Sequence, residues 1–132
     1  MGRIQMGEKR KIVLEELGKI IVKKVRNGES YKNLAEIAQI LWSDVEEMPS
    51  AVKDFISDFA VRAGDFDTAL KFLRWGGNQY ANILLGGLVA GVCQGDVETI
   101  KRLWTEENQM ALEMLEKDYI EKLANAWLEN VK

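Results

Sequence analysis

Apolar residues recur along the chain at spacings of three and four, which is the period of one face of an α-helix. Leu14, Leu17, Ile21 and Val25 predict a helix over residues 8–26, which Asn27 and Gly28 end. Similar stripes predict further helices from Ser30 through Val45, from Pro49 to Gly64, from Asp65, from Asn78 to Gly95, from Asp96, and a last long helix to Val131. No segment alternates as a strand does. The pattern predicts an all-α fold in one domain over residues 1–132, a compact bundle of six to seven antiparallel helices with roughly 75–80% helix.

One stretch is apolar on every side. Residues 83–93 contain no charged or strongly polar side chain, which is typical of a central, buried helix. We therefore expect this stretch to be the most buried of the chain, with Cys93 a buried, inert small residue. Small residues four apart, Gly87 with Gly91 and Gly86 with Ala90, let another helix approach closely. That helix can belong to the same chain or to a second copy.

Two turns of the chain match at an offset of 31 residues. Residues 64–73 and 95–104 both begin with Gly-Asp and share the threonine three residues after the aspartate. Glycine ends one helix and aspartate caps the next, so each copy predicts a helical hairpin. Residues 59–73 resemble the turn between the two helices of a tetratricopeptide repeat, on Gly64, Asp65, Phe66 and Ala69.

The resemblance extends over residues 59–104 and implies stacked helical hairpins. The second copy departs from the pattern, because Ile100 stands where the family has a small alanine, and the closing proline is absent after both copies. A non-repetitive bundle with two similar turns is the alternative.

Net charge is −3 but unevenly distributed. Residues 1–33 carry nine basic and four acidic groups, whereas residues 34–132 carry nine basic and seventeen acidic groups. The single cysteine forbids an internal disulfide, and no stretch approaches the length and apolarity of a membrane span. We expect a cytoplasmic protein that does not bind a membrane.

Two residue types that are common in active sites are rare or absent in this sequence. The chain has no histidine and one cysteine, so it lacks the usual general base and the usual metal ligands. The pair Asp65 and Asp67 offers carboxylates for a magnesium ion, but both stand at a predicted helix start, as do Asp96 and Glu98. We expect no catalytic, cofactor or metal site and no enzyme activity, with a carboxylate-dependent enzyme as the least favoured class.

Two classes of binding protein remain. The favoured interpretation is a small helical protein–protein interaction module, a scaffold or adaptor for another protein or for itself. Its expected partner surface, which a homodimer would bury around Trp127, is the apolar stripe of the last helix: Leu112, Leu115, Tyr119, Leu123 and Trp127.

The alternative is a nucleic-acid-associated regulator that uses the basic N-terminal helix through Lys23, Lys24 and Arg26. Nucleic acid is the less favoured partner, because the residues after position 33 carry a surplus of eight acidic groups. A helix-turn-helix over residues 31–48 would present a recognition segment with three acidic and no basic residues.

Overall fold

The computed structural model describes residues 2–74 and 77–131, with side chains from Gly7 onward. These residues form eight α-helices and one short 3-10 helix, and no strand occurs among them. The all-α prediction is confirmed, and the helical content is 80%. The helices are α1 (Gly2–Arg26), α2 (Tyr31–Leu41), the 3-10 helix η1 (Val45–Glu47), α3 (Ser50–Arg62), α4 (Phe66–Lys71), α5 (Asn78–Gln94), α6 (Val97–Leu103), α7 (Glu106–Leu112) and α8 (Lys117–Val131).

The chain divides into two compact units, which are described separately below. Unit 1 is Met1–Phe72 and unit 2 is Leu73–Lys132. The single domain expected over residues 1–132 stays a prediction.

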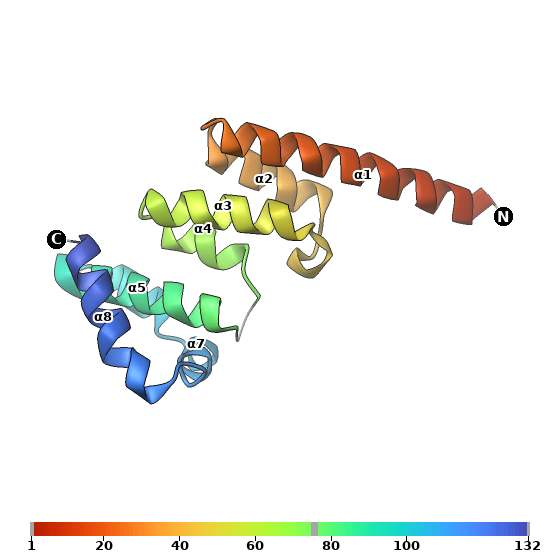
Figure 1. Ribbon diagram of the computed structural model, residues 1–132. Coiled ribbons are helices and arrows are strands. Elements are labelled where there is room, and N and C mark those ends of the chain that lie inside the picture. The colour runs from red at the N-terminus through yellow and green to blue at the C-terminus, as the bar shows by residue number, and fades with distance from the viewer. Residues whose placement is uncertain (1, 75–76, 132) are drawn as a thin grey trace. The chain divides into compact units, whose positions relative to one another are not determined.

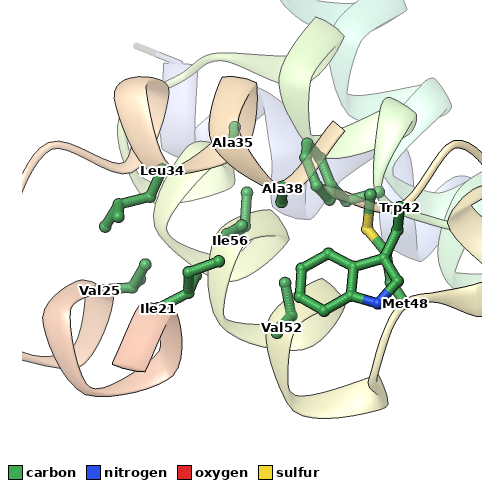
Figure 2. Packing of buried hydrophobic residues seen from close by; sticks show 10 residues of the cluster. Ile21, Val25, Leu34, Ala35, Ala38, Trp42, Met48, Val52 and Ile56 are labelled. Carbon is green, nitrogen blue, oxygen red and sulfur yellow. The ribbon is translucent and has the colours of Figure 1, made fainter. Parts of the chain in front are cut away.

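Unit 1 is built on mutual packing of α1, α2 and α3, with α4 against α3. Its buried apolar core, most of which is seen in Figure 2, combines the inward stripes that the spacing predicts. Side chains of α1, α2 and α3 meet there with three side chains that follow α2, η1 and α4: Ile21, Val25, Leu34, Ala35, Ala38, Trp42, Met48, Val52, Ile56 and Phe72.

Helix α2 is shorter than its apolar stripe predicts. It ends at Leu41, and Trp42 adopts an extended backbone that turns its side chain into the core. Asp44 then caps the 3-10 helix η1, accepting a hydrogen bond from the backbone N–H of Glu46 at 3.0 Å. Val45 is therefore outside α2, because the side chain of Asp44 starts a new turn with its own local hydrogen bond.

The two matched turns have the geometry that the sequence predicts. Gly64 and Gly95 adopt left-handed backbone conformations with φ of 77° and 66°, where only glycine is unstrained. Asp65 and Asp96 then cap α4 and α6, accepting from the backbone N–H of Thr68 and Thr99 at 3.2 and 3.1 Å. The threonine hydroxyls also donate to the same carboxylates, at 2.7 and 2.6 Å. Both predicted caps are confirmed.

Asp65 has one contact that Asp96 lacks. The hydroxyl of Tyr31, at the start of α2, donates to Oδ2 of Asp65 at 2.9 Å. Burial would raise the pKa of Asp65, but the hydrogen bonds from Thr68 and Tyr31 and the charge of Lys32 together hold that pKa below its ordinary value of 3.8. The same pairing, with burial as the larger cause, raises the pKa of Tyr31 to about 12.

We expect Asp65→Ala to destabilise the protein by about 0.5–2 kcal/mol at neutral pH, the range for a lost helix cap. The loss should exceed that of Asp96→Ala, because Asp65 also joins α2 to the α3–α4 turn through Tyr31. Since the pKa of Asp65 is lowered in the folded state, the difference from wild type should be complete above pH 3.8 and shrink as pH falls below it. Thermal melts followed by circular dichroism from pH 2 to pH 7 measure this. Equal losses at both caps would contradict the role given to Tyr31.

Tyr31→Phe tests the alkaline side of the same contact. Because the pKa of Tyr31 is raised in the folded state, the stabilisation that the Tyr31 side chain provides is complete below its ordinary pKa of 10.0. This stabilisation is lost as pH rises toward about 12. Between these values the melting temperature of the wild type should fall more steeply than that of Tyr31→Phe. If the melting temperatures of the wild type and Tyr31→Phe fall equally as pH rises, Tyr31 ionises as it does in the unfolded chain.

Unit 2 is organised around α5, against which α6, α7 and α8 pack. Eight residues of α5 between Ala81 and Gly91 are buried, which agrees with the expected central helix. Its N-cap is Gly77, which makes no side-chain hydrogen bond, so Asn78 does not cap the helix. Asn78 is instead the first residue of the helix.

The expected burial of Cys93 is also wrong. Val92 and Cys93 are exposed, although they continue the apolar run. Helix α6 folds back over the side of α5 that carries Gly91, where a Cβ atom would lie 2.9 Å from Cδ1 of Ile100. The next two residues of α5 point away from that side, because each residue turns by about 100° around the helix axis. Apolarity alone does not reveal which side is covered.

Cys93 should therefore react with a water-soluble thiol reagent in the native protein. We expect complete modification by dithionitrobenzoate without denaturant, at a rate close to that of the unfolded chain, because the side chain is exposed. Reaction only after unfolding in guanidinium would contradict the exposure of the last turn of α5.

The predicted last long helix is two helices. Helix α7 ends at Leu112, and a turn over residues 113–116 separates it from α8. A second break at Trp104 and Thr105 separates α6 from α7, where Thr105 accepts from the backbone N–H of Asn108 at 3.1 Å. The break after Leu112 raises the number of helices above the expected six to seven, and the three short helices α6, α7 and α8 pack along α5.

Candidate functional site

The apolar residues predicted to contact a partner lie at the end of α7, in the turn over residues 113–116 and along α8. We call the turn, with the adjoining first turn of α8, the elbow. Leu112 ends α7, Leu115 lies in the turn, and the other three are in α8. Leu112, Leu115, Leu123 and Trp127 are half-buried, whereas Tyr119 is exposed. Figure 1 shows α8 beside α5, and the packing of these two helices decides which part of the stripe stays open.

The side chain of Trp127 makes its contacts inside unit 2. Its indole packs so closely on Gly86 of α5 that a Cβ atom there would be 2.6 Å from Cε2 of the ring. The indole N–H also donates to Oδ1 of Asn82 at 2.8 Å. Helices of the same chain therefore cover the small residues of α5, at Gly86 by Trp127 and at Gly91 by Ile100.

Three of the predicted residues line one open groove. Leu115, Tyr119 and Leu123 surround a hollow of about 220 Å³ together with Asn78, Asn82 and Glu116. Leu112 and Trp127 do not line it. The three polar residues were not among the predicted ones. Asn82 directly precedes the apolar run 83–93. A polar side chain next to a buried apolar run is the one feature of the sequence that could have indicated Asn82 as a groove residue.

Hydrogen bonds hold the elements around the groove. The hydroxyl of Tyr80, in the first turn of α5, donates to Oδ1 of Asn108 in α7 at 2.7 Å. Asn108 in turn donates to the carbonyl of Leu103 at 2.8 Å. Burial and the nearby charge of Glu107 raise the pKa of Tyr80 above its ordinary value of 10.0. This network ties α7 to α5 and α6, and so helps to hold the elbow that carries Leu115.

The elbow carries a surplus of acidic groups. Four acidic residues occur between positions 113 and 121, against one basic residue: Glu113, Glu116, Asp118 and Glu121 against Lys117. Glu116 is the one that lines the groove. A positively charged group that approaches the groove is therefore attracted.

The groove offers hydrogen-bond donors, acceptors and apolar surface. In the part of the chain that the structure describes, no group of three or more cysteine, aspartate or glutamate side chains is placed to hold a metal ion. Asp65 and Asp96, the carboxylates with lowered pKa values, are engaged as helix caps. The arrangement suits reversible binding of a ligand.

The basic residues of the nucleic-acid alternative lie at the C-terminal end of α1. Lys23 is exposed. The ammonium group of Lys24 pairs with Glu29 at 3.2 Å, and the guanidinium of Arg26 stacks over the ring of Phe55 at 5.7 Å. Two of the three thus have partners within unit 1, and nothing in their placement favours phosphate contacts over these.

Within residues 2–74 and 77–131, no helix combines the length and the apolarity that crossing a membrane requires. Comparison of the chain with family models, with curated proteins and with solved structures gives no match.

Proposed function

We propose that the protein is a helical protein-interaction module, a scaffold or adaptor, whose groove in unit 2 binds a short segment of another protein. The observation that carries the proposal is the convergence of Leu115, Tyr119 and Leu123 with two asparagine side chains on one open hollow. Apolar side chains left partly open to solvent are what a partner surface requires.

The size and polarity of the groove favour a peptide. Its volume of about 220 Å³ is smaller than the roughly 300–1,000 Å³ of pockets for small molecules, and suits a single apolar side chain. The amide groups of Asn78 and Asn82 both donate and accept hydrogen bonds, as pairing with a peptide backbone requires. The hydrogen bond from Trp127 to Asn82 holds one of these amides in place before a ligand arrives.

The acidic groups beside the groove indicate which residue should adjoin the apolar residue of that peptide. Glu116 lines the groove, and the elbow around it is acidic. We infer a ligand with one bulky apolar residue next to a lysine or arginine. The basic group would pair with Glu116 at the rim, where the interaction contributes more to selection between partners than to affinity.

Selection from a random peptide library displayed on phage tests the proposal. We expect enrichment of peptides in which an apolar residue adjoins lysine or arginine. Tyr119→Ala should abolish their binding, whereas Trp104→Ala should not; both aromatic residues belong to unit 2 and are 54% and 53% exposed. Glu116→Lys should weaken the same peptides, with Glu98→Lys on α6 as the control.

Two results would overturn the proposal. One is a selection without enrichment above an uncoated surface. The other is a set of enriched peptides that bind Tyr119→Ala as tightly as wild type, which would place the binding surface elsewhere.

A further inference from the structure

Helix α1 extends well beyond the rest of unit 1. Figure 1 shows its N-terminal part running past the ends of α2 and α3. Every residue from Gly7 to Val13 is exposed. On the side of α1 nearest α3, Leu14 and Lys11 border an open hollow of about 810 Å³ whose far wall is Trp42 and Pro49. About half of α1 is therefore a helix without the packing that normally stabilises one in water.

The outward face of α1 is apolar at its centre. Lys9, Ile12, Val13, Glu16 and Ile20 follow one another at spacings of three, one, three and four, so they share one side of the helix. The three apolar members are all exposed, and Val13 is 55% exposed. Isoleucine and valine in this arrangement form a short apolar stripe between charged residues.

The two charged residues of this face carry opposite charges and stand on either side of its apolar centre. Lys9 stands before Ile12 and Glu16 after Val13, whereas Arg10, Lys11 and Glu15 line the hollow on another side of α1. If a second α1 runs antiparallel about a two-fold axis between Ile12 and Val13, the basic end of each face meets the acidic end of the other. Lys9 then lies opposite Glu16 of the other copy, twice, and Ile12 lies opposite Val13.

We propose that two copies of the chain associate through antiparallel pairing of their α1 helices, centred on Ile12 and Val13. Parallel pairing is disfavoured, because it sets Lys9 against Lys9 and Glu16 against Glu16 of the other copy and aligns the helix dipoles. Glu16 already pairs with Lys19 of its own helix at 3.4 Å, and a carboxylate has room to accept from Lys9 of the second copy as well.

Pairing along α1 alone makes a small contact, so we expect a reversible dimer that depends on concentration. It is independent of the groove in unit 2, so each proposal can fail without the other.

A charge-swap series tests the register. Sedimentation equilibrium of the full chain should give a mass approaching twice 15.0 kDa as concentration rises. Lys9→Glu and Glu16→Lys should each weaken the dimer about tenfold or more, because each sets like charges opposite one another twice. The double variant Lys9→Glu with Glu16→Lys should restore the wild-type dissociation constant. A general effect of charge on solubility would not produce this recovery.

A charged substitution at Val13 and a cross-link locate the two-fold axis. Val13→Lys should give a monomer, whereas Val97→Lys, at a valine of α6 that is 62% exposed, should not. In a Cys93→Ser background, which removes the exposed native thiol, Val13→Cys should form an oxidised dimer and Val97→Cys should not.

Several results would overturn the proposal. They are a mass of 15.0 kDa at every concentration up to the solubility limit, a dimer that survives Val13→Lys, or a double charge swap that stays as weak as the single variants. If the monomer instead binds vesicles containing phosphatidylserine and Val13→Lys abolishes that binding, the face is a membrane contact.

Discussion

Replacing Ile56 with alanine is expected to lower the free energy of unfolding by about 2–5 kcal/mol, the range for deleting a large aliphatic side chain from a core. Ile56 in α3 is fully buried and lies among side chains of α1 and α2, as Figure 2 shows. The lost contacts and the remaining cavity both contribute, and three helices would have to move together to close that cavity. Urea denaturation followed by circular dichroism measures the change.

Ile40→Ala is the matched control. Ile40 lies in α2 of the same unit and is 80% exposed, so its removal should change the free energy of unfolding by no more than about 0.5 kcal/mol. A loss at Ile40 comparable to that at Ile56 would mean that the outer side of α2 is covered. Similar small losses at both positions would contradict the core of unit 1.

Gly86→Ala should destabilise unit 2 by about 1–3 kcal/mol, although alanine is normally the better helix former. The new Cβ atom would lie 2.6–2.9 Å from three ring atoms of Trp127, a separation that the rigid indole cannot relieve by bending. Either the indole shifts and weakens its hydrogen bond to Asn82, or α8 moves away from α5. The measurement is again chemical denaturation.

A double-mutant cycle isolates the cause. In a Trp127→Ala background the obstructing ring is gone, so Gly86→Ala should be neutral or stabilising by up to about 1 kcal/mol. Gly7→Ala is a second control, because nothing lies within 4 Å of a Cβ atom built at Gly7. If Gly86→Ala destabilises equally with and without Trp127, the close approach of α8 to α5 is not the reason.

The candidate groove and the α1 face differ in how much of each the sequence reveals. Leu115, Tyr119 and Leu123 could be chosen from their spacing, because they belong to the apolar stripe that the sequence shows between residues 112 and 127. Asn78 and Asn82 could not, since they reach the groove only through the packing of α5 against the elbow. The exposure of Ile12 and Val13 was equally hidden, because it depends on where α2 and α3 end beside α1.

The sequence by itself determined the features that rest on local interactions. The all-α class, the turns at Gly64 and Gly95 and the caps at Asp65 and Asp96 all follow from backbone conformation and hydrogen bonds within a few residues. Such interactions are encoded where they occur, so spacing and residue type are sufficient to predict them.

The tertiary structure alone decided which side of each helix is covered. Cys93 ends the apolar run 83–93 and Trp127 belongs to the apolar stripe of α8, yet Cys93 is exposed and Trp127 packs on Gly86. The division of the last predicted helix into α7 and α8 was decided in the same way, because the surface of α5 favours short segments that change direction. Periodicity shows that a helix has an apolar side but does not identify the surface that this side meets. That depends on contacts between residues far apart in the chain.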